Sequence, residues 1–120
     1  MQHGGAKHHR QRVGEALKDE IAIILEGELA DPRIGLASVS EVHLSPDGRI
    51  ARVFVIVPGS DAETAEAMKG LDAAKNYIRR ELTERLHWRQ APELFFQLDR
   101  ADQYGSRIDE LLNRIEKRRK

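Results

Sequence analysis

The chain has no cysteine, few aromatic residues (5%), no long hydrophobic run and a formal net charge of zero. The lack of cysteine excludes a thiolate zinc site, a thiol nucleophile and a disulfide framework. No apolar segment approaches the ~20 residues that a helix needs to span a bilayer. Residues 1–12 are polar and rich in histidine, so we expect no secretory signal there. These absences together predict a cytoplasmic protein without a membrane partner.

Catalytic signatures are also missing. The chain contains no GxxxxGK, GxGxxG, GxSxG or HExxH motif. His43 and His87 have no Ser, Asp or second His at a spacing that suggests a catalytic partner. The N-terminal histidines His3, His8 and His9 lack nearby acidic ligands, which makes a metal site there a poor prospect. We expect no enzymatic activity, no cofactor, no metal and no small-molecule substrate.

What the chain does contain is typical of one folded domain. Its 120 residues are 40% hydrophobic and 33% charged, a composition of soluble globular proteins. A chain of this size buries roughly two-thirds of its unfolded surface and needs no metal or disulfide to stay folded. We expect a single domain over residues 1–120, with an ordered core at about 11–115 and flexible ends at 1–10 and 117–120.

The first half of the chain predicts a helix followed by a hairpin. Apolar residues at helical spacing predict a helix over about 12–29, which Pro32 prevents from continuing. Residues 36–44 are rich in β-formers, and residues 50–57 alternate between two faces. The Pro46-Asp47-Gly48 turn between them favours an antiparallel hairpin. The apolar residues of the helix are Val13, Leu17, Ile21, Ile24, Leu25 and Leu29.

The second half predicts helix and then strand. Ser60 and Glu63 form the pattern of a capping box, and a helical pattern runs from there to Trp88. Because Gly70 interrupts this long pattern, we predict two helices with a bend between residues 70 and 76. A strand at 94–98 and a short helix over 106–115 follow. The fold class is therefore α+β: a three-stranded sheet with helices on one face, and a right-handed crossover from the second strand to the third.

Positive charge is concentrated in three segments although the chain is neutral. Residues 1–12, 75–89 and 114–120 are basic, and the segments between them are acidic. Phosphate binding depends on the local cluster, because salt screens exposed charges beyond about 8 Å. The basic segments can therefore make one positive face. A helix surface that is merely solvated remains the alternative.

Within the middle basic segment, Lys75 and Arg79 are the stronger phosphate candidates. They lie four residues apart, so they share a helix face, and neither has an acid four residues later. Trp88 and Tyr77 are the only aromatic candidates for base stacking, and both fit packing at a helix edge equally well. Two other arginines are expected to form ordinary intrahelical ion pairs, Arg80 with Glu84 and Arg85 with Glu81.

A string of local motifs resembles bacterial ribosome-binding factor A over about residues 7–115. Each motif is weak alone, but their order and spacing make a strong joint signal, and the element order resembles a type II KH domain. The matching pieces are Asp31-Pro32-Arg33-Ile34-Gly35, Val39-Ser40-Glu41-Val42, Ser45-Pro46-Asp47, Ala51-Arg52-Val53-Phe54-Val55, Ile78-Arg79-Arg80-Glu81-Leu82 with Arg85-Leu86, Pro92-Glu93-Leu94-Phe95-Phe96 and Gly105-Ser106-Arg107-Ile108-Asp109-Glu110-Leu111-Leu112.

The resemblance implies a non-catalytic assembly factor that acts on the ribosome. Such a factor binds the small (30S) ribosomal subunit during late 16S rRNA maturation, including trimming of the rRNA ends, and is linked to growth in the cold. We expect a monomer. The family carries a helix–kink–helix in place of the GxxG loop of ordinary KH domains. Here Ala74-Lys75-Asn76 corresponds to the bend, with Asn76 replacing a glycine and Gly70 sharing the bend.

The predicted RNA contacts come from the basic segments and the bend. Shape and backbone contacts are expected to dominate over base reading. One alternative is a protein–protein interaction module with a KH-like fold and no direct RNA contact; another is a small α+β enzyme with an unrecognised site. Salt-dependent binding to purified small subunits distinguishes the RNA-binding factor from the protein–protein module. The predicted RNA-binding residues are Arg10, Arg12, Arg33, Lys75, Asn76, Arg79, Arg80, Arg85 and Arg89.

Overall fold

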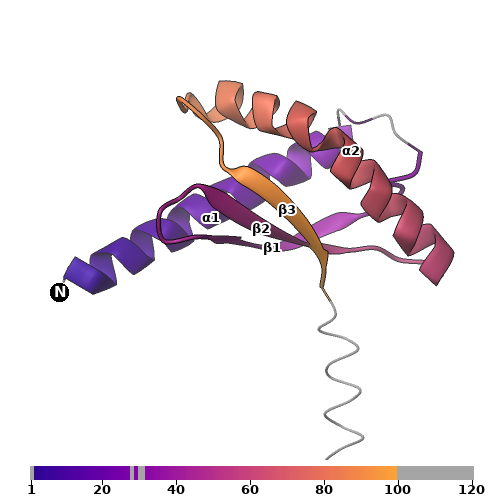
Figure 1. Ribbon diagram of the computed structural model, residues 1–120, viewed down its shortest axis with the longest axis horizontal. Helices are drawn as coiled ribbons and strands as arrows, with labels where there is room; N and C mark the ends of the chain where they lie inside the picture. Colours follow the sequence, from indigo (N-terminus) through magenta and orange to yellow (C-terminus); the bar gives the residue numbers. More distant parts are fainter. Residues whose placement is uncertain (1, 28, 30–31, 100–120) are drawn as a thin grey trace, which may run out of the picture.

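The computed structural model describes residues 2–27, 29 and 32–99 as two helices and three strands (Figure 1). The predicted helix over 106–115 and the end at 117–120 lie outside these residues. Among the described helices, none is long and apolar enough to cross a membrane. In chain order the elements are α1 (Gln2–Gly27), β1 (Ser38–Leu44), β2 (Ile50–Ile56), α2 (Asp61–Leu86) and β3 (Glu93–Leu98).

The three strands form one sheet in the order β1-β2-β3. β1 and β2 are antiparallel, as the hairpin signal predicted, with an irregularity between Val39 and Glu41. β2 and β3 are parallel. Parallel neighbours require a long connection, and α2 supplies it. All three strands were predicted to within two residues at each end.

The β1–β2 turn is held by its own polar side chains. Gly48 has a φ of 73°, in the left-handed region that favours glycine. The Ser45 hydroxyl donates to Asp47 Oδ1 at 2.7 Å, and the Arg49 backbone N–H donates to the same oxygen at 3.1 Å. These two bonds to the carboxylate, the Ser45 bond first, lower the pKa of Asp47 below its ordinary value of 3.8.

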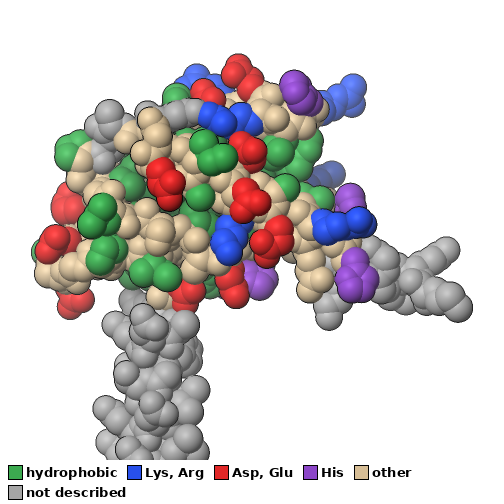
Figure 2. Space-filling view, turned by 180° about the vertical axis from the view of Figure 1, so that it is seen from behind, with side chains coloured by type: hydrophobic (Ala, Val, Ile, Leu, Met, Phe, Trp, Pro, Cys, Tyr) green, Lys and Arg blue, Asp and Glu red, His purple; other side chains and the backbone are tan. Residues whose placement is uncertain are grey.

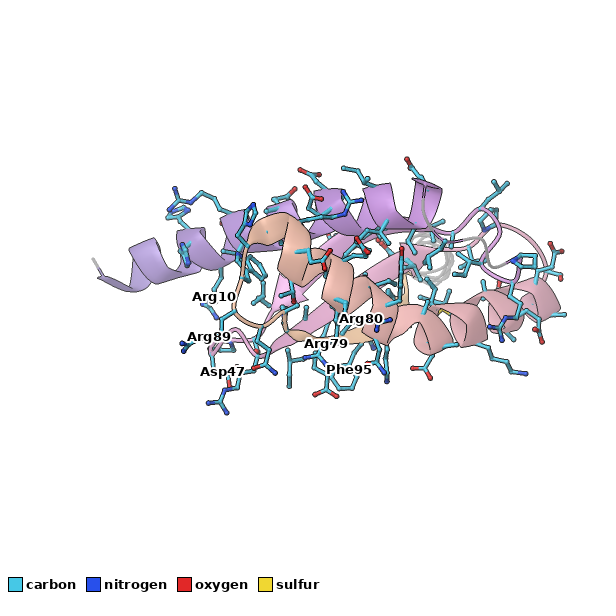
Figure 3. The ribbon with its side chains drawn as sticks, turned by 90° about the horizontal axis from the view of Figure 1, so that it is seen from above. Arg10, Asp47, Arg79, Arg80, Arg89 and Phe95 are labelled. Carbon is cyan, nitrogen blue, oxygen red and sulfur yellow. The ribbon has the colours of Figure 1, made fainter. Side chains whose placement is uncertain are left out.

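Both helices pack on the same face of the sheet and share its core. Figure 3, seen from above, shows α1 and α2 side by side over the strands. The alternation along each strand explains this layer, because only one set of side chains faces the helices. The largest fully buried side chains are Leu17, Ile21 and Ile24 of α1, Leu71, Ile78 and Leu82 of α2, and Val53, Val55 and Leu94 of the sheet.

A glycine allows α1 to approach the sheet closely. Gly14 is buried, and a Cβ atom at this position would lie 2.8 Å from the Val42 carbonyl oxygen of β1. Real Cβ atoms do not come that close to a backbone oxygen. The spacing between α1 and β1 therefore depends on the missing side chain.

The helices differ from their predicted bounds. α1 begins at Gln2 rather than residue 12. Residues 2–11 lack apolar periodicity and include two glycines and three histidines, which are poor helix formers, so the extension reflects propagation from the packed part of α1. α1 ends at Gly27 rather than 29.

The prediction of two helices over 61–88 was wrong: α2 is one continuous helix that begins at the expected Ser60–Glu63 capping box. Gly70 is buried within it, and one glycine costs a helix only about 1 kcal/mol, which packing offsets. The helix is unbroken, but its axis changes direction part-way along (Figure 1). It ends where His87 adopts a left-handed conformation with φ 54°.

Candidate nucleic-acid interface

The second half of α2 and the loop that follows it line a shallow groove of about 530 Å³. Four residues predicted to contact RNA meet there: Asn76, Arg79, Arg80 and Arg89. The bend residues Gly70 and Ala74 are buried or partly buried toward the core instead. The remaining lining residues are Thr83, Glu84, Gln90 and Ala91.

Arg79 is a structural residue of this groove. Its Nε donates to the Pro92 carbonyl and its Nη2 donates to the Ala91 carbonyl, both at 3.0 Å. These bonds hold the α2–β3 loop against the helix. Acidic residues three or four positions away are the partners that sequence spacing can indicate, so this use of the guanidinium group by two loop carbonyls was not predicted. Figure 3 shows Arg79 and Arg80 side by side on α2.

Arg80 and Arg89 are the exposed cations of the groove. The expected Arg80–Glu84 ion pair was wrong: in the described part of the chain Arg80 makes no ion pair or hydrogen bond. Arg89 lies exposed in the α2–β3 loop, and within the same residues it also has no such partner. Among the arginines of this groove, Arg80 and Arg89 are therefore the two whose guanidinium N–H groups are all available to a ligand.

Other predicted cations are already paired. Lys75 Nζ lies 3.3 Å from Asp72, one turn earlier on α2. Arg85 forms the predicted pair with Glu81, at 3.8 Å, and also reaches Glu20 of α1 at 3.5 Å. Arg85 therefore ties the two helices together.

The structure does not gather all of the predicted residues at one place. Arg12 lines a separate groove of about 840 Å³ between α1 and β1, with His8 from α1 and His43 from β1. Arg33 lines a third pocket, beside the start of α2. Arg10 and Arg89 both lie toward the end of the molecule where α1 begins (Figure 3).

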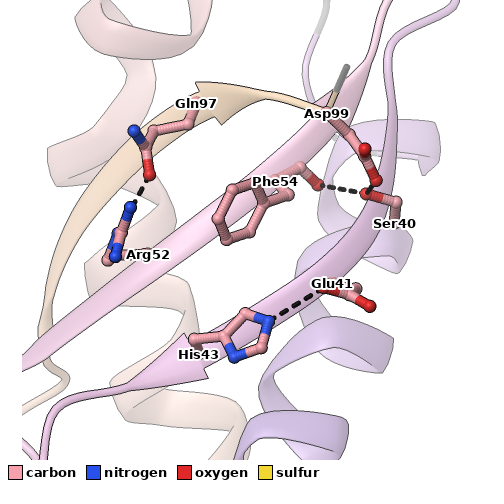
Figure 4. Close-up of polar contacts among 7 residues, drawn as sticks. All are labelled: Ser40, Glu41, His43, Arg52, Phe54, Gln97 and Asp99. Carbon is pink, nitrogen blue, oxygen red and sulfur yellow. Dashed lines mark hydrogen bonds and ion pairs between the residues drawn. The ribbon is translucent and has the colours of Figure 1, made fainter. Parts of the chain in front are cut away.

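Sequence reasoning missed the uncovered face of the sheet. His43, Arg52, Phe54, Phe95 and Gln97 come from all three strands and share this face (Figure 4 shows all but Phe95). The rings of His43 and Phe54 meet edge to face, with centroids 5.4 Å apart. The Arg52 Cζ atom lies 5.6 Å from the centroid of the Phe54 ring. Strand alternation over residues 50–57 placed Arg52 and Phe54 on one face of the second strand, but no function was predicted for that face.

The two aromatic residues that the sequence did single out serve the core. Tyr77 and Trp88 are partly buried and pack against it. Among the described residues, no group of three His, Asp or Glu is placed to hold a metal ion.

Residues 9–112 match the family model described as ribosome-binding factor A. The chain is 52% identical over 120 residues to the ribosome-binding factor A of Koribacter versatilis, covering 100% of this chain and 98% of that protein. It is 43% identical to the one from Thermomicrobium roseum, over 93% of this chain and 87% of that protein. The chain belongs to the ribosome-binding factor A family.

Solved structures of ribosome-binding factor A share the fold. The crystal structure of the Thermus thermophilus factor has a TM-score of 0.69 and 29% identity, covering 77% of this chain and 97% of that one. A homology model of the Thermus thermophilus factor, fitted into a cryo-EM map of a 30S complex, has a TM-score of 0.60 and 31% identity, covering 72% and 91%. The KH-like α+β fold predicted from the sequence is thereby confirmed.

Charge is unevenly distributed over this member of the ribosome-binding factor A family. In Figure 2, histidine and basic side chains gather toward the end of the molecule where α1 begins. Acidic and hydrophobic side chains dominate the opposite end in that view. A neutral chain can therefore present a local positive region to a polyanion.

Proposed function

We propose that this chain is a non-catalytic assembly factor of the small ribosomal subunit. It binds the 30S subunit as a cytoplasmic monomer and assists late maturation of 16S rRNA. Membership of the ribosome-binding factor A family supports this proposal, and so does the fitting of a Thermus thermophilus relative into a 30S complex.

The main support for an RNA-binding surface is the pair of exposed arginines in the groove along α2. Arg80 and Arg89 come from the helix and from the loop that Arg79 holds against it. Guanidinium groups bind phosphate oxygens bidentately, and exposed ones need not break an existing ion pair first. Asn76 and Gln90 add neutral donors along the same groove. The groove is therefore suited to the sugar-phosphate backbone of folded rRNA.

Binding through phosphates predicts a specific salt dependence. Each phosphate neutralised contributes about 0.7–0.9 to the slope of log affinity against log salt. The Arg80→Gln/Arg89→Gln double variant removes two exposed cations, so its slope should be smaller by about 1.4–1.8. The affinity of the double variant for the small subunit at physiological salt should also fall. Its free energy of unfolding should stay within about 0.5 kcal/mol of the wild-type value, because both side chains are exposed.

The test is co-sedimentation with purified mature and immature small subunits over a series of salt concentrations. Lys69→Gln is the matched control, because Lys69 is an exposed cation on the same helix but lies outside the groove and pairs with Glu66 at 3.6 Å. Equal losses in the double variant and the control would refute the assignment of the surface. Binding that does not change with salt would favour a protein–protein module.

The maturation role has its own readout. Cells that carry only the double variant should accumulate 16S rRNA with untrimmed ends, since the factor is then recruited less. Purified wild-type protein incubated with immature subunits alone should leave those ends uncut. Cleavage in that incubation would show that the factor is an enzyme.

A further inference from the structure

The side of the sheet that faces away from the helices carries two rows of side chains in register. His43, Arg52 and Phe95 are direct neighbours across β1, β2 and β3. Glu41, Phe54 and Gln97 form the next row. Rows two residues apart on a strand point to the same face and lie roughly 6.5 Å apart. These six residues define what we call the open sheet face.

Planar groups dominate the open sheet face. Phe95 has 45% of its surface exposed although it lies in the middle of β3. Arg52 extends over the Phe54 ring, and its Nε donates to Gln97 Oε1 at 2.9 Å. This bond fixes the plane of the guanidinium group and leaves the terminal nitrogens for other acceptors. His43 is held by a 2.8 Å contact between its Nε2 and Glu41.

No described element covers the centre of this face, since both helices pack on the other side of the sheet. At the β1 edge of the face, Glu41 and His43 also border the groove between α1 and β1. Ile50 and Ile56 of β2 are exposed on the open sheet face as well, by 39% and 45%. A single exposed apolar side chain is common on a protein surface, but several that share one uncovered face mark an interaction site.

We propose that the open sheet face binds unpaired RNA bases, which stack on Phe95 and on the Arg52–Phe54 pair. Single-stranded RNA is commonly recognised by bases that stack on aromatic rings and on guanidinium planes and that hydrogen bond through their edges. The amide nitrogen of Gln97 and the carboxylate of Glu41 lie beside these planes as edge partners. This proposal rests on the proposed function for its ligand, and it adds a second contact surface to the groove.

The same chemistry argues against a protein partner at this place. The buried centre of a protein–protein interface is depleted of Lys, Glu and Asp, although Phe and Arg are enriched there. Here the carboxylate Glu41 stands at the β1 end of one row, beside Phe54, whereas Arg52 lies between His43 and Phe95 in the other row. An ordinary protein surface laid over Glu41 would remove water from its carboxylate, for which His43 is the partner on this face. Base edges and phosphates supply donors and acceptors for Glu41 and Arg52.

The test uses a fluorescein-labelled oligouridine of about eight nucleotides, whose binding is followed by fluorescence anisotropy at physiological salt. A sequence-independent contact of this kind should have a dissociation constant of about 10⁻⁴ to 10⁻⁶ M. Phe95→Leu removes the ring but keeps an apolar side chain, and it should weaken binding by about 5- to 150-fold. Phe95→Trp should retain the affinity or raise it.

Two controls separate base stacking from other contacts. An abasic oligomer keeps the phosphates but loses stacking on both Phe95 and the Arg52–Phe54 pair, so it should bind wild-type protein at least as weakly as oligouridine binds Phe95→Leu. Ile56→Val trims a non-planar residue on the same face and should leave the affinity within about twofold. Melting temperatures of the variants should match that of the wild type, because both side chains are exposed.

Equal binding of oligouridine by the wild type and Phe95→Leu would overturn the proposal, and so would equal binding of the abasic oligomer. A dimer that forms through this face and that RNA does not dissociate would also overturn it. Co-sedimentation with small subunits is measured in parallel. Subunit binding without oligouridine binding refutes the stacking site alone, whereas oligouridine binding without subunit binding refutes the proposed function alone.

Discussion

Arg79 and Arg80 are neighbours on α2, and we predict that changing each to glutamine affects different properties: the stability of the fold for Arg79 and subunit binding for Arg80. Arg79→Gln should destabilise the fold, because the shorter side chain cannot bridge the Ala91 and Pro92 carbonyls. Arg80→Gln should leave stability unchanged and weaken binding to the small subunit, because this side chain is exposed and makes no ion pair or hydrogen bond among the described residues.

The magnitude for Arg79 follows from its two hydrogen bonds. Each is 3.0 Å long and has a charged donor, and such a bond contributes about 1.5–3 kcal/mol when part-buried. Allowing for the remaining exposure of the guanidinium group, we expect a total loss of about 2–4 kcal/mol. For a domain of this size, that loss lowers the melting temperature by about 8–16 °C.

The assay is thermal unfolding followed by circular dichroism, with subunit binding measured well below both transitions. Arg79→Lys is the informative third variant. It keeps the charge but loses the planar fork, so it should destabilise nearly as much as Arg79→Gln. An Arg79→Gln protein as stable as the wild type would refute the reasoning, as would full stability of Arg79→Lys combined with instability of Arg79→Gln.

Three further predictions concern packing and charge. Gly14→Ala should destabilise by about 1–2 kcal/mol relative to Gly27→Ala in urea unfolding, because a Cβ at position 14 meets a carbonyl oxygen whereas position 27 is open. Leu82→Ala, which empties a fully buried site, should cost about 2–5 kcal/mol in the same assay. Ser45→Ala should raise the pKa of Asp47 toward 3.8 in an NMR titration. The pKa of Asp47 is lower in the folded protein than in the unfolded chain. The hydrogen bonds to its carboxylate therefore stabilise the fold at pH values above the unfolded-state pKa, and this stabilisation is lost as the pH falls through the folded-state pKa.

Much of the fold could be predicted from the sequence because its signals are local. Alternation at Ile50–Ile56 and the turn ending in Gly48 located the hairpin, and Ser60 with Glu63 located the start of α2. The continuity of α2 could not be predicted in the same way. A buried glycine breaks a helix or is tolerated in it according to what packs around it, and that information is tertiary.

The candidate site was harder to predict because its cations were judged from neighbours along one helix. Spacing gave Arg80 an acidic partner that it does not contact, and left Arg79 apparently without one. The true partners of Arg79 are carbonyl groups in a loop, which carry no sequence signal of charge. The open sheet face was missed for a related reason: Arg52 and Phe95 become neighbours only once β2 and β3 pair.

The parallel pairing of β2 with β3 has a consequence for the order in which the chain folds. The β1–β2 hairpin closes over a short turn, but β3 can pair with β2 only after the whole of α2 has been laid across the sheet. Contacts between residues far apart in sequence form late, because the loop-closure entropy must be lost first. The α2–β3 loop is therefore organised near the end of folding. A partly folded chain carries the same arginines, but it has no groove that brings Arg80 and Arg89 together.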